Sequence, residues 1–118
     1  MNLSDPTTMK LPNREQAHVP KRKLTAYLLS RAHPVGRSKA RFFRQLGFDE
    51  TNVEDLRQSL RKVARRAEID EAEQTPHGTK YAVVGSVHTP DGDSVRVRTV
   101  WIIESEEEAP RFVTAYPA

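Results

Sequence analysis

The chain has 118 residues, of which 36% are hydrophobic and none is cysteine, and its formal net charge is +3. This length fits one compact domain with an ordinary core, and the missing cysteines exclude disulfides and thiolate metal sites. No apolar run approaches the roughly 20 residues that cross a bilayer, and the N-terminus lacks the regions of a signal peptide, so we expect a cytoplasmic protein without membrane contact.

Residues 1–16 contain Pro6, Pro12 and several small polar residues without a clear period. This composition is typical of a flexible leader. We therefore expect the leader to be followed by a single domain over residues 17–118.

Three segments of the front half show apolar residues at helical spacing. The first covers about 20–31 and starts near Pro20, which suits a first helical turn. The second covers about 38–46, with Ser38 as its predicted N-cap. The third starts at Thr51–Glu54, which has the form of a capping box. The apolar positions are Leu24, Tyr27 and Leu28 in the first segment, Phe42, Phe43 and Leu46 in the second, and Leu56, Leu60, Val63, Ala64 and Ala67 in the third.

The hydrophobic period changes from 3.6 to 2 at Lys80. The new period predicts strands over 81–88, 94–104 and 111–116, whereas the acidic segment 68–74 is expected to lead out of the third helix. Neighbouring strands with short connections should pair antiparallel as a meander. The predicted fold class is therefore α+β, with about three N-terminal helices followed by an antiparallel β-meander and the helices on one face.

The strand predicted over 94–104 carries apolar residues on both faces, so it should lie in the interior of the sheet. Arg98 beside Val100 is then partly enclosed, and an enclosed guanidinium needs a partner. That partner is either a carboxylate, from Glu104 or an acidic helix residue, or a substrate phosphate bound in a bidentate manner. One face of this strand carries Val95, Val97, Thr99, Trp101 and Ile103, and in the last strand Phe112, Thr114 and Tyr116 should share a face.

The connection between the first two helices concentrates cationic groups. The stretch from His33 to Phe43 holds an imidazole, an ammonium and two guanidiniums around a Pro/Gly turn. Lys39 and Arg41 project from the first turn of the second helix, where free backbone N–H groups also attract anions. This combination favours a phosphate site that includes His33, Arg37, Lys39 and Arg41. The alternative is a simple connector in which His33 ends a helix.

Motifs for several other chemistries are missing from the sequence. It contains no glycine-rich nucleotide-binding motif, no HxxxH or CxxC spacing and no Gly-x-Ser-x-Gly. Its four histidines are scattered, so we predict neither a metal nor a cofactor. The imidazole, ammonium, guanidinium and hydroxyl groups that remain suit metal-free cleavage of RNA. Such cleavage needs a base for the 2′-hydroxyl, an acid for the leaving 5′-oxygen and cations around the phosphorus.

Charge is distributed unevenly along the chain. Residues 10–66 hold 15 Lys/Arg against 5 Asp/Glu, whereas residues 67–118 hold 4 against 10. The basic half predicts a surface for a polyanion such as nucleic acid, although solvated helix faces would give the same pattern. A non-catalytic module that docks RNA or an acidic protein through the third helix is therefore the alternative to an enzyme. Its basic face would carry Arg57, Arg61, Lys62, Arg65 and Arg66.

Several short strings of the chain resemble one small bacterial family. They are Leu11-Pro12-Asn13, Lys23-Leu24-x-x-Tyr27-Leu28-Leu29, His33-Pro34-x-Gly36-x-x-Lys39-Ala40-Arg41-x-Phe43, Leu46-Gly47, Val97-Arg98-Thr99-x-Trp101-Ile102 and Pro110-Arg111-x-x-Thr114-x-Tyr116. Members of this family occur alone and as the C-terminal toxin domain of contact-dependent growth-inhibition and other polymorphic toxins, and some are described only as a domain of unknown function. The wider group that the chain is similar to is the barnase/EndoU/colicin/RelE-like ribonuclease fold, in which helices precede an antiparallel sheet.

The resemblance implies a metal-independent endoribonuclease that cleaves tRNA or another structured RNA through a 2′,3′-cyclic phosphate. It implies a site core of His33, Lys39, Arg98 and Thr114, with Thr99, Trp101 and Tyr116 beside it. In this site His33 is the general base or acid, Lys39 and Arg98 stabilise the phosphate, Thr114 orients the substrate and Tyr116 takes part in proton transfer. The implied partners are RNA rather than DNA, and a cognate immunity protein.

The chain departs from the family's pattern in the link 68–80. This link is rich in Glu and holds the extra His77. A change in this link can alter the choice of substrate without altering the site core.

Overall fold

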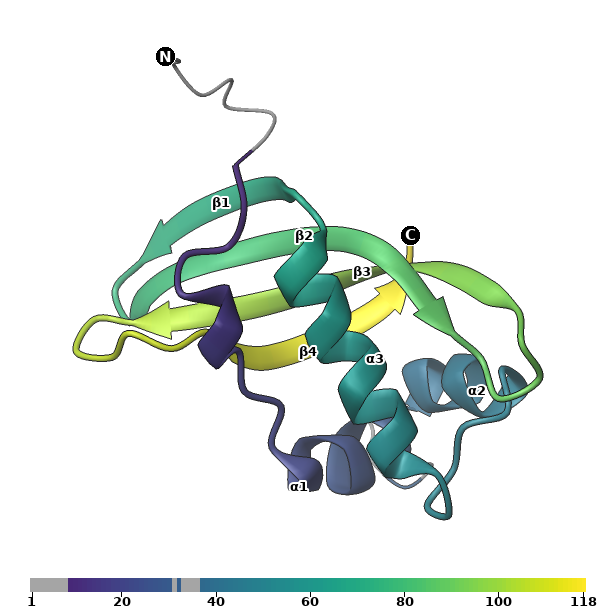
Figure 1. The fold of residues 1–118 in the computed structure, drawn as a ribbon. Helices are drawn as coiled ribbons and strands as arrows, with labels where there is room; N and C mark the ends of the chain where they lie inside the picture. The colour runs from purple at the N-terminus through teal and green to yellow at the C-terminus, as the bar shows by residue number, and fades with distance from the viewer. Residues whose placement is uncertain (1–8, 31, 33–36) are drawn as a thin grey trace.

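The computed structural model describes residues 9–30, 32 and 37–118, and within them helical segments come first and a sheet follows (Figure 1). The helical segments are η2 (Arg14–Gln16), α1 (Lys21–Lys23), η3 (Leu24–Leu28), α2 (Arg37–Gln45) and α3 (Val53–Arg66). The strands are β1 (Ile69–Thr75), β2 (Gly78–His88), β3 (Ser94–Glu104) and β4 (Arg111–Pro117). They form one antiparallel sheet in the order β1-β2-β3-β4. This arrangement confirms the predicted α+β fold class and its meander.

The sheet contains one strand more than the sequence predicts. Residues 69–75 form β1, although the acidic segment 68–74 is expected only to lead out of the third helix. β1 is an edge strand whose side chains are mostly exposed on both faces, so it lacks the apolar alternation that predicts a strand. Tertiary pairing with β2, rather than local pattern, makes this segment extended.

Helix α3 packs across one face of the sheet, and the core lies between them (Figure 1). Gly85 permits the close approach of helix and sheet, because a Cβ there would lie 3.0 Å from Val63 Cγ1 and 3.3 Å from Ala67 Cβ. Trp101 and Phe112 are fully buried in this layer, with ring centroids 5.4 Å apart in an edge-to-face arrangement. The face of the sheet opposite α3 is called the site face below.

The first helical region is shorter and wider than the expected helix at 20–31. The three residues of α1 lead into the π-helical turn η3, where the Leu29 N–H donates to the Leu24 carbonyl at 2.8 Å. The wider turn lets Leu24, Leu28 and Leu29 all reach the core, where each is fully buried. Tyr27 lies in the same turn and is only partly buried.

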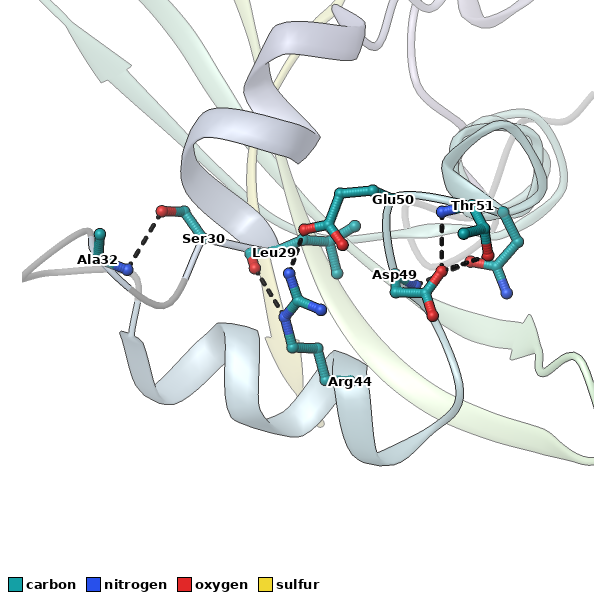
Figure 2. Close-up of polar contacts among 8 residues, drawn as sticks. Leu29, Ser30, Ala32, Arg44, Asp49, Glu50 and Thr51 are labelled. Carbon is teal, nitrogen blue, oxygen red and sulfur yellow. Dashed lines mark hydrogen bonds and ion pairs between the residues drawn. The ribbon is translucent and has the colours of Figure 1, made fainter.

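The connection between α2 and α3 is fixed by polar contacts (Figure 2). Arg44 Nε donates to the Leu29 carbonyl at 2.9 Å, and the Arg44 guanidinium also pairs with Glu50. The Asp49 carboxylate accepts hydrogen bonds from the Thr51 N–H at 2.8 Å and from the Thr51 hydroxyl at 2.5 Å. The bond from the Thr51 side chain is the main cause that lowers the pKa of Asp49, and the bond from Arg44 is the main cause that lowers the pKa of Glu50. These contacts hold α2 against η3.

The two predicted helix caps are wrong. Helix α3 has Asn52 as its N-cap residue, without a side-chain capping bond. The Asn52 side chain accepts a hydrogen bond from the Asp49 N–H at 2.8 Å, and Glu54 bonds to side chains of its own helix. Helix α2 begins at Arg37, so Ser38 lies inside its first turn. The polar side chains before α3 form their hydrogen bonds within the loop and do not cap the N–H groups at the start of the helix.

The folded domain begins earlier than residue 17. Leu11 is fully buried, and the Met9 carbonyl accepts a hydrogen bond from the Ile69 N–H at 2.8 Å. Lys10 forms an antiparallel bridge with Glu68. Residues 9–16, which are expected to belong to a flexible leader, therefore pack against the domain.

Candidate functional site

A bulge in β4 decides which of its side chains point away from the core. Phe112 lies opposite Trp101, but Thr114 lies opposite the residue just before Trp101, so Val113 is an extra residue. Phe112 therefore faces the core, while Thr114 and Tyr116 lie on the site face. The expectation that all three share one face is wrong, because one inserted residue reverses the alternation that follows it.

Side chains of the site face are arranged in cross-strand rows. One row consists of Val84, Arg98 and Tyr116, and the next row consists of Ala82, Val100 and Thr114. Arg98 and Tyr116 are thus direct neighbours on adjacent strands. Thr114 lies two residues along β4 from Tyr116, roughly 7 Å away at the rise of a strand.

Helical segments lie beyond the β4 edge of the sheet (Figure 1). Their side chains add further groups to the site face. Lys39 of α2 places its Nζ 5.9 Å from the centroid of the Tyr116 ring, within the range of a cation–π contact. The Tyr27 hydroxyl of η3 shares a hydrogen bond of 3.1 Å with Thr114 Oγ1. Lys23 Nζ lies 4.8 Å from the Tyr27 ring centroid. The helical region and the last strand thus contribute side chains to one continuous set of contacts.

Reasoning from periodicity missed Tyr27 and Lys23 as site residues. Tyr27 fits the apolar stripe of the first helix, and periodicity therefore assigns it to the core. The signal that includes both residues is the string Lys23-Leu24-x-x-Tyr27, which resembles the bacterial family described above.

Arg98 is held by two carboxylates of β1. Its Nη1 donates to Asp70 Oδ2 at 2.5 Å, and its Nη2 donates to Glu71 Oε1 at 2.6 Å. Consecutive residues of a regular strand point to opposite faces, but Asp70 is an extra, bulged residue, which lets both carboxylates reach Arg98 across β2. The hydrogen bond to Asp70 raises the pKa of Arg98, and a bond with Tyr116 contributes to the rise. The expected carboxylate partner therefore exists, although it comes from β1 and not from Glu104 or a helix.

A hollow of about 130 Å³ lies beside Arg98 on the site face. It is lined by Glu71, Glu73, Lys80, Tyr81, Ala82, Arg98, Val100 and Tyr116. The Arg98 side chain is 23% exposed, so its guanidinium is shielded but remains in reach of a ligand. An anion in this hollow meets an ammonium, a guanidinium and a phenol, and the carboxylates of Glu71 and Glu73 also belong to the lining.

Thr99 and Trp101 lie on the core face and do not border this site. Both residues are fully buried. Trp101 Nε1 donates to Thr99 Oγ1 at 2.8 Å, and the Thr99 hydroxyl donates to the Val83 carbonyl at 2.7 Å. The expectation that Thr99 and Trp101 contact the substrate is wrong, because their polar groups form hydrogen bonds inside the core.

Helix α2 presents its three arginines on a different side from Lys39. An open hollow of about 430 Å³ is lined by Arg37, Arg41, Arg44 and Gln45. On a helical projection Lys39 and Arg41 are separated by roughly 160°, so Arg41 does not share the Tyr116 contact. His33, the expected general base or acid, lies outside the described residues.

Two arginines of the predicted basic face form hydrogen bonds with backbone carbonyls of the N-terminal segment. Arg57 Nε donates to the Val19 carbonyl at 2.8 Å, and Arg61 Nε donates to the Ala17 carbonyl at 3.1 Å. Arg57 also pairs with Glu54 at 2.9 Å. These bonds tie α3 to the N-terminal segment, so the basic face open to a partner is smaller than the sequence predicts.

Within the part of the chain that the structure describes, no group of three or more His, Cys, Asp or Glu side chains is arranged to hold a metal ion. None of its helices combines the length and the apolar character needed to cross a membrane.

The fold and the site define a small α+β protein with cationic and hydroxyl side chains gathered on one face of an antiparallel sheet. A family model described as "Domain of unknown function (DUF6883)" matches residues 10–118. The chain therefore belongs to the DUF6883 family. No curated protein matches the chain.

The fold is shared with a chain from the contact-dependent growth inhibition toxin–immunity protein complex of Klebsiella pneumoniae 342. The TM-score is 0.68 at 15% sequence identity, and the match covers 89% of this chain and 96% of that chain. At this level of identity the likeness establishes a common fold and nothing finer.

Proposed function

We propose that the chain is a toxin-type endoribonuclease that needs no metal ion and cleaves tRNA or another structured RNA to leave a 2′,3′-cyclic phosphate. The observation that carries this proposal is the gathering of Lys39, Arg98, Thr114 and Tyr116 on the site face. Metal-free cleavage at phosphorus needs cations for the developing charge and groups that exchange protons with the two reacting oxygens. These four side chains supply two cations and two hydroxyl groups.

Each side chain has a role that fits its position. Lys39 and Arg98, which both lie next to Tyr116, stabilise the charge on the phosphate in the transition state. Thr114 orients the substrate, since its hydroxyl is itself held by Tyr27. The Tyr116 phenol takes part in proton transfer. The family resemblance assigns the remaining acid or base to His33.

The two carboxylates on Arg98 set its orientation without using all of its donors. A guanidinium has five N–H donors, and the bonds to Asp70 and Glu71 use one donor on each terminal nitrogen. Other donors are left for a phosphate in the adjacent hollow. Asp70 and Glu71 are therefore positioning residues for Arg98.

The toxin role is supported by the fold. The chain shares its fold with a component of a toxin–immunity complex, and it carries two cations and two hydroxyl groups on one face of the sheet of that fold. We propose that it acts on RNA in the cytoplasm and that a cognate immunity protein neutralises it.

A non-catalytic RNA-binding module is the second candidate. The hollow on the far side of α2 favours it, because Arg37 and Arg41 offer guanidiniums to a phosphate backbone there. The basic face of α3 supports it less, since Arg57 and Arg61 are bonded to backbone carbonyls.

The experiment measures RNA affinity and product formation in parallel for the wild type, His33→Ala and Arg98→Ala. A lost acid or base costs about 10²–10⁴ in rate, because such groups act chiefly on the transition state, so cleavage should fall far more than affinity. Arg96→Ala, an exposed residue of the same strand as Arg98, is the matched control. Products are analysed for 2′,3′-cyclic phosphate ends.

Two results would contradict the proposal. A wild-type chain that binds tRNA, rRNA or mRNA but cuts none of them is a binding module. Cleavage by His33→Ala at the wild-type rate removes His33 from the mechanism and leaves it a connector residue.

A further inference from the structure

A third cross-strand row follows on the site face, beyond the row of Thr114. It consists of Lys80, Ile102 and Arg111, which lie opposite one another on β2, β3 and β4. This row borders a hollow of about 410 Å³. The hollow is lined by Lys23, His77, Lys80, Ile102, Glu104, Arg111, Phe112 and Val113. Its groups come from α1, the β1–β2 turn and three strands, so it is a product of the tertiary fold.

The lining combines positive charge with an apolar floor. Three cationic side chains and the imidazole of His77 surround the hollow, and Ile102 and Val113 supply apolar surface. Glu104 is the single carboxylate among the lining residues, and it is already paired with Arg111. Cations bind the phosphate and sugar of a nucleotide, while an apolar or imidazole surface packs against its base.

Two connections join this hollow to the candidate active site. Lys80 lines both this hollow and the hollow beside Arg98. Lys23 lies 4.8 Å from the Tyr27 ring, and the Tyr27 hydroxyl bonds to Thr114. The rows of Arg98 and Lys80 are four residues apart along the sheet, roughly 13 Å at the rise of a strand. This separation exceeds one nucleotide, so a single RNA strand can occupy both hollows.

We infer that this second hollow, called the flanking subsite, binds a nucleotide one step beyond the two that the scissile phosphate joins. The inference rests on the ribonuclease function proposed above, and it adds that the substrate is an RNA strand of several nucleotides held along the site face. Lys23, Lys80 and Arg111 bind the backbone of the flanking nucleotide, and its base packs against Val113 and His77.

The first test compares short and long substrates of the full chain. Arg111→Gln changes a residue that lines the flanking subsite but not the hollow beside Arg98, and Arg96→Gln removes the same charge elsewhere on the sheet. KM for a 12-nucleotide RNA should rise about tenfold in Arg111→Gln, as expected for one lost charge-assisted hydrogen bond. Cleavage of a dinucleoside monophosphate, which occupies only the active site, should remain at the wild-type rate, and Arg96→Gln should leave both substrates unaffected.

A binding measurement separates this inference from the proposed function. The 12-nucleotide RNA with 2′-O-methyl groups cannot be cleaved, because its attacking hydroxyls are blocked, yet it can still bind. Arg111→Gln should weaken its binding about tenfold and reduce the slope of affinity against salt by about one, whereas Arg96→Gln should change neither. His77→Ala should weaken the same binding with little change in the salt slope, since it removes a packing surface.

Each outcome decides between the two claims. The flanking subsite is overturned if Arg111→Gln binds the RNA as tightly as the wild type does. It is also overturned if Arg111→Gln and Arg96→Gln lose the same affinity, even if the wild type cleaves RNA. Displacement of the RNA by an equal charge of polyglutamate also overturns it, because the hollow is then a general surface for acidic proteins. A third outcome is that Arg111→Gln weakens RNA binding, Arg96→Gln does not, and the wild type cleaves no RNA. That outcome supports the flanking subsite and contradicts only the proposed catalysis.

Discussion

Tyr116 connects the groups of the candidate site at the scale of single residues. Its ring lies 5.9 Å from Lys39 Nζ, and its neighbour across the strand pair is Arg98. The Lys39 ammonium near the aromatic face and the Arg98 side chain in the cross-strand position both pack beside Tyr116, which limits the rotamers that these side chains can adopt. Tyr116 thus helps to orient both cations that the proposed mechanism uses.

Arg98→Lys should lower kcat on a tRNA substrate by on the order of 10²-fold. An ammonium cannot reproduce the planar fork that holds Asp70, Glu71 and a phosphate at once, so this exchange is not conservative. The measurement is kcat for tRNA cleavage from steady-state kinetics, with Arg96→Lys as the control. Wild-type kcat in Arg98→Lys would show that the bidentate geometry of Arg98 is unimportant for cleavage.

Two bulges determine the site at the scale of the strands. In β1 the extra residue Asp70 allows two consecutive carboxylates to reach Arg98. In β4 the extra residue Val113 moves Thr114 and Tyr116 onto the site face. Each bulge changes which face a side chain occupies, and bulges are frequent next to active sites for this reason.

The connection between α2 and α3 should make the fold sensitive to acid. The pKa values of Asp49 and Glu50 are lowered from 3.8 and 4.5, so the folded state binds fewer protons than the unfolded state in this range. Their contribution to stability is complete above about pH 4.5 and is lost as the pH falls through the lowered values. The melting temperature, followed by circular dichroism, should therefore decrease as the pH is lowered from 6 to 3.

Glu50→Gln tests this explanation because it removes the pairing with Arg44. Its melting temperature should depend less on pH than that of the wild type, whereas Glu106→Gln in the exposed β3–β4 connection should behave as the wild type does. The same pH dependence in Glu50→Gln and the wild type would exclude Glu50 as a source of the acid sensitivity.

At the scale of the whole molecule, the two faces of the sheet differ in what they contact. One face packs against the core, and the other carries the polar side chains of the candidate site. Helix α3 covers the core face, while α1 and α2 lie beyond the β4 edge (Figure 1). The side chains of Lys39 and Tyr27 contact Tyr116 and Thr114 of the site face, and Lys23 lies next to Tyr27. The site face also receives Arg98 and Thr114 from the sheet itself. The arrangement places side chains from both ends of the chain around one surface.

RNA cleavage by the full chain should persist in EDTA, since the proposed mechanism draws its positive charge from Lys39 and Arg98 rather than from a metal ion. The assay follows tRNA cleavage with and without chelator, beside a metal-dependent nuclease that confirms the chelator is effective. Activity that disappears in EDTA and returns with a divalent ion would contradict the mechanism.

Local pattern in the sequence was sufficient for much of the fold. Apolar periodicity is set by neighbouring residues, so it predicts α2, α3, β2, β3 and β4 without knowledge of the tertiary structure. The residue types also indicate the chemistry, since Lys39, Arg98, Thr114 and Tyr116 carry groups suited to a phosphate. Their assignment to one site came from the resemblance of short strings rather than from periodicity.

Only the tertiary structure decided which of the candidate residues meet. β1 becomes a strand because it pairs with β2, and the bulges at Asp70 and Val113 arise from the register between strands. Neither property is visible in a single segment, because register depends on the partner strand. Alternation within β3 puts Thr99 and Trp101 on the face opposite Arg98, and only the tertiary structure shows that this face is the one packed against the core.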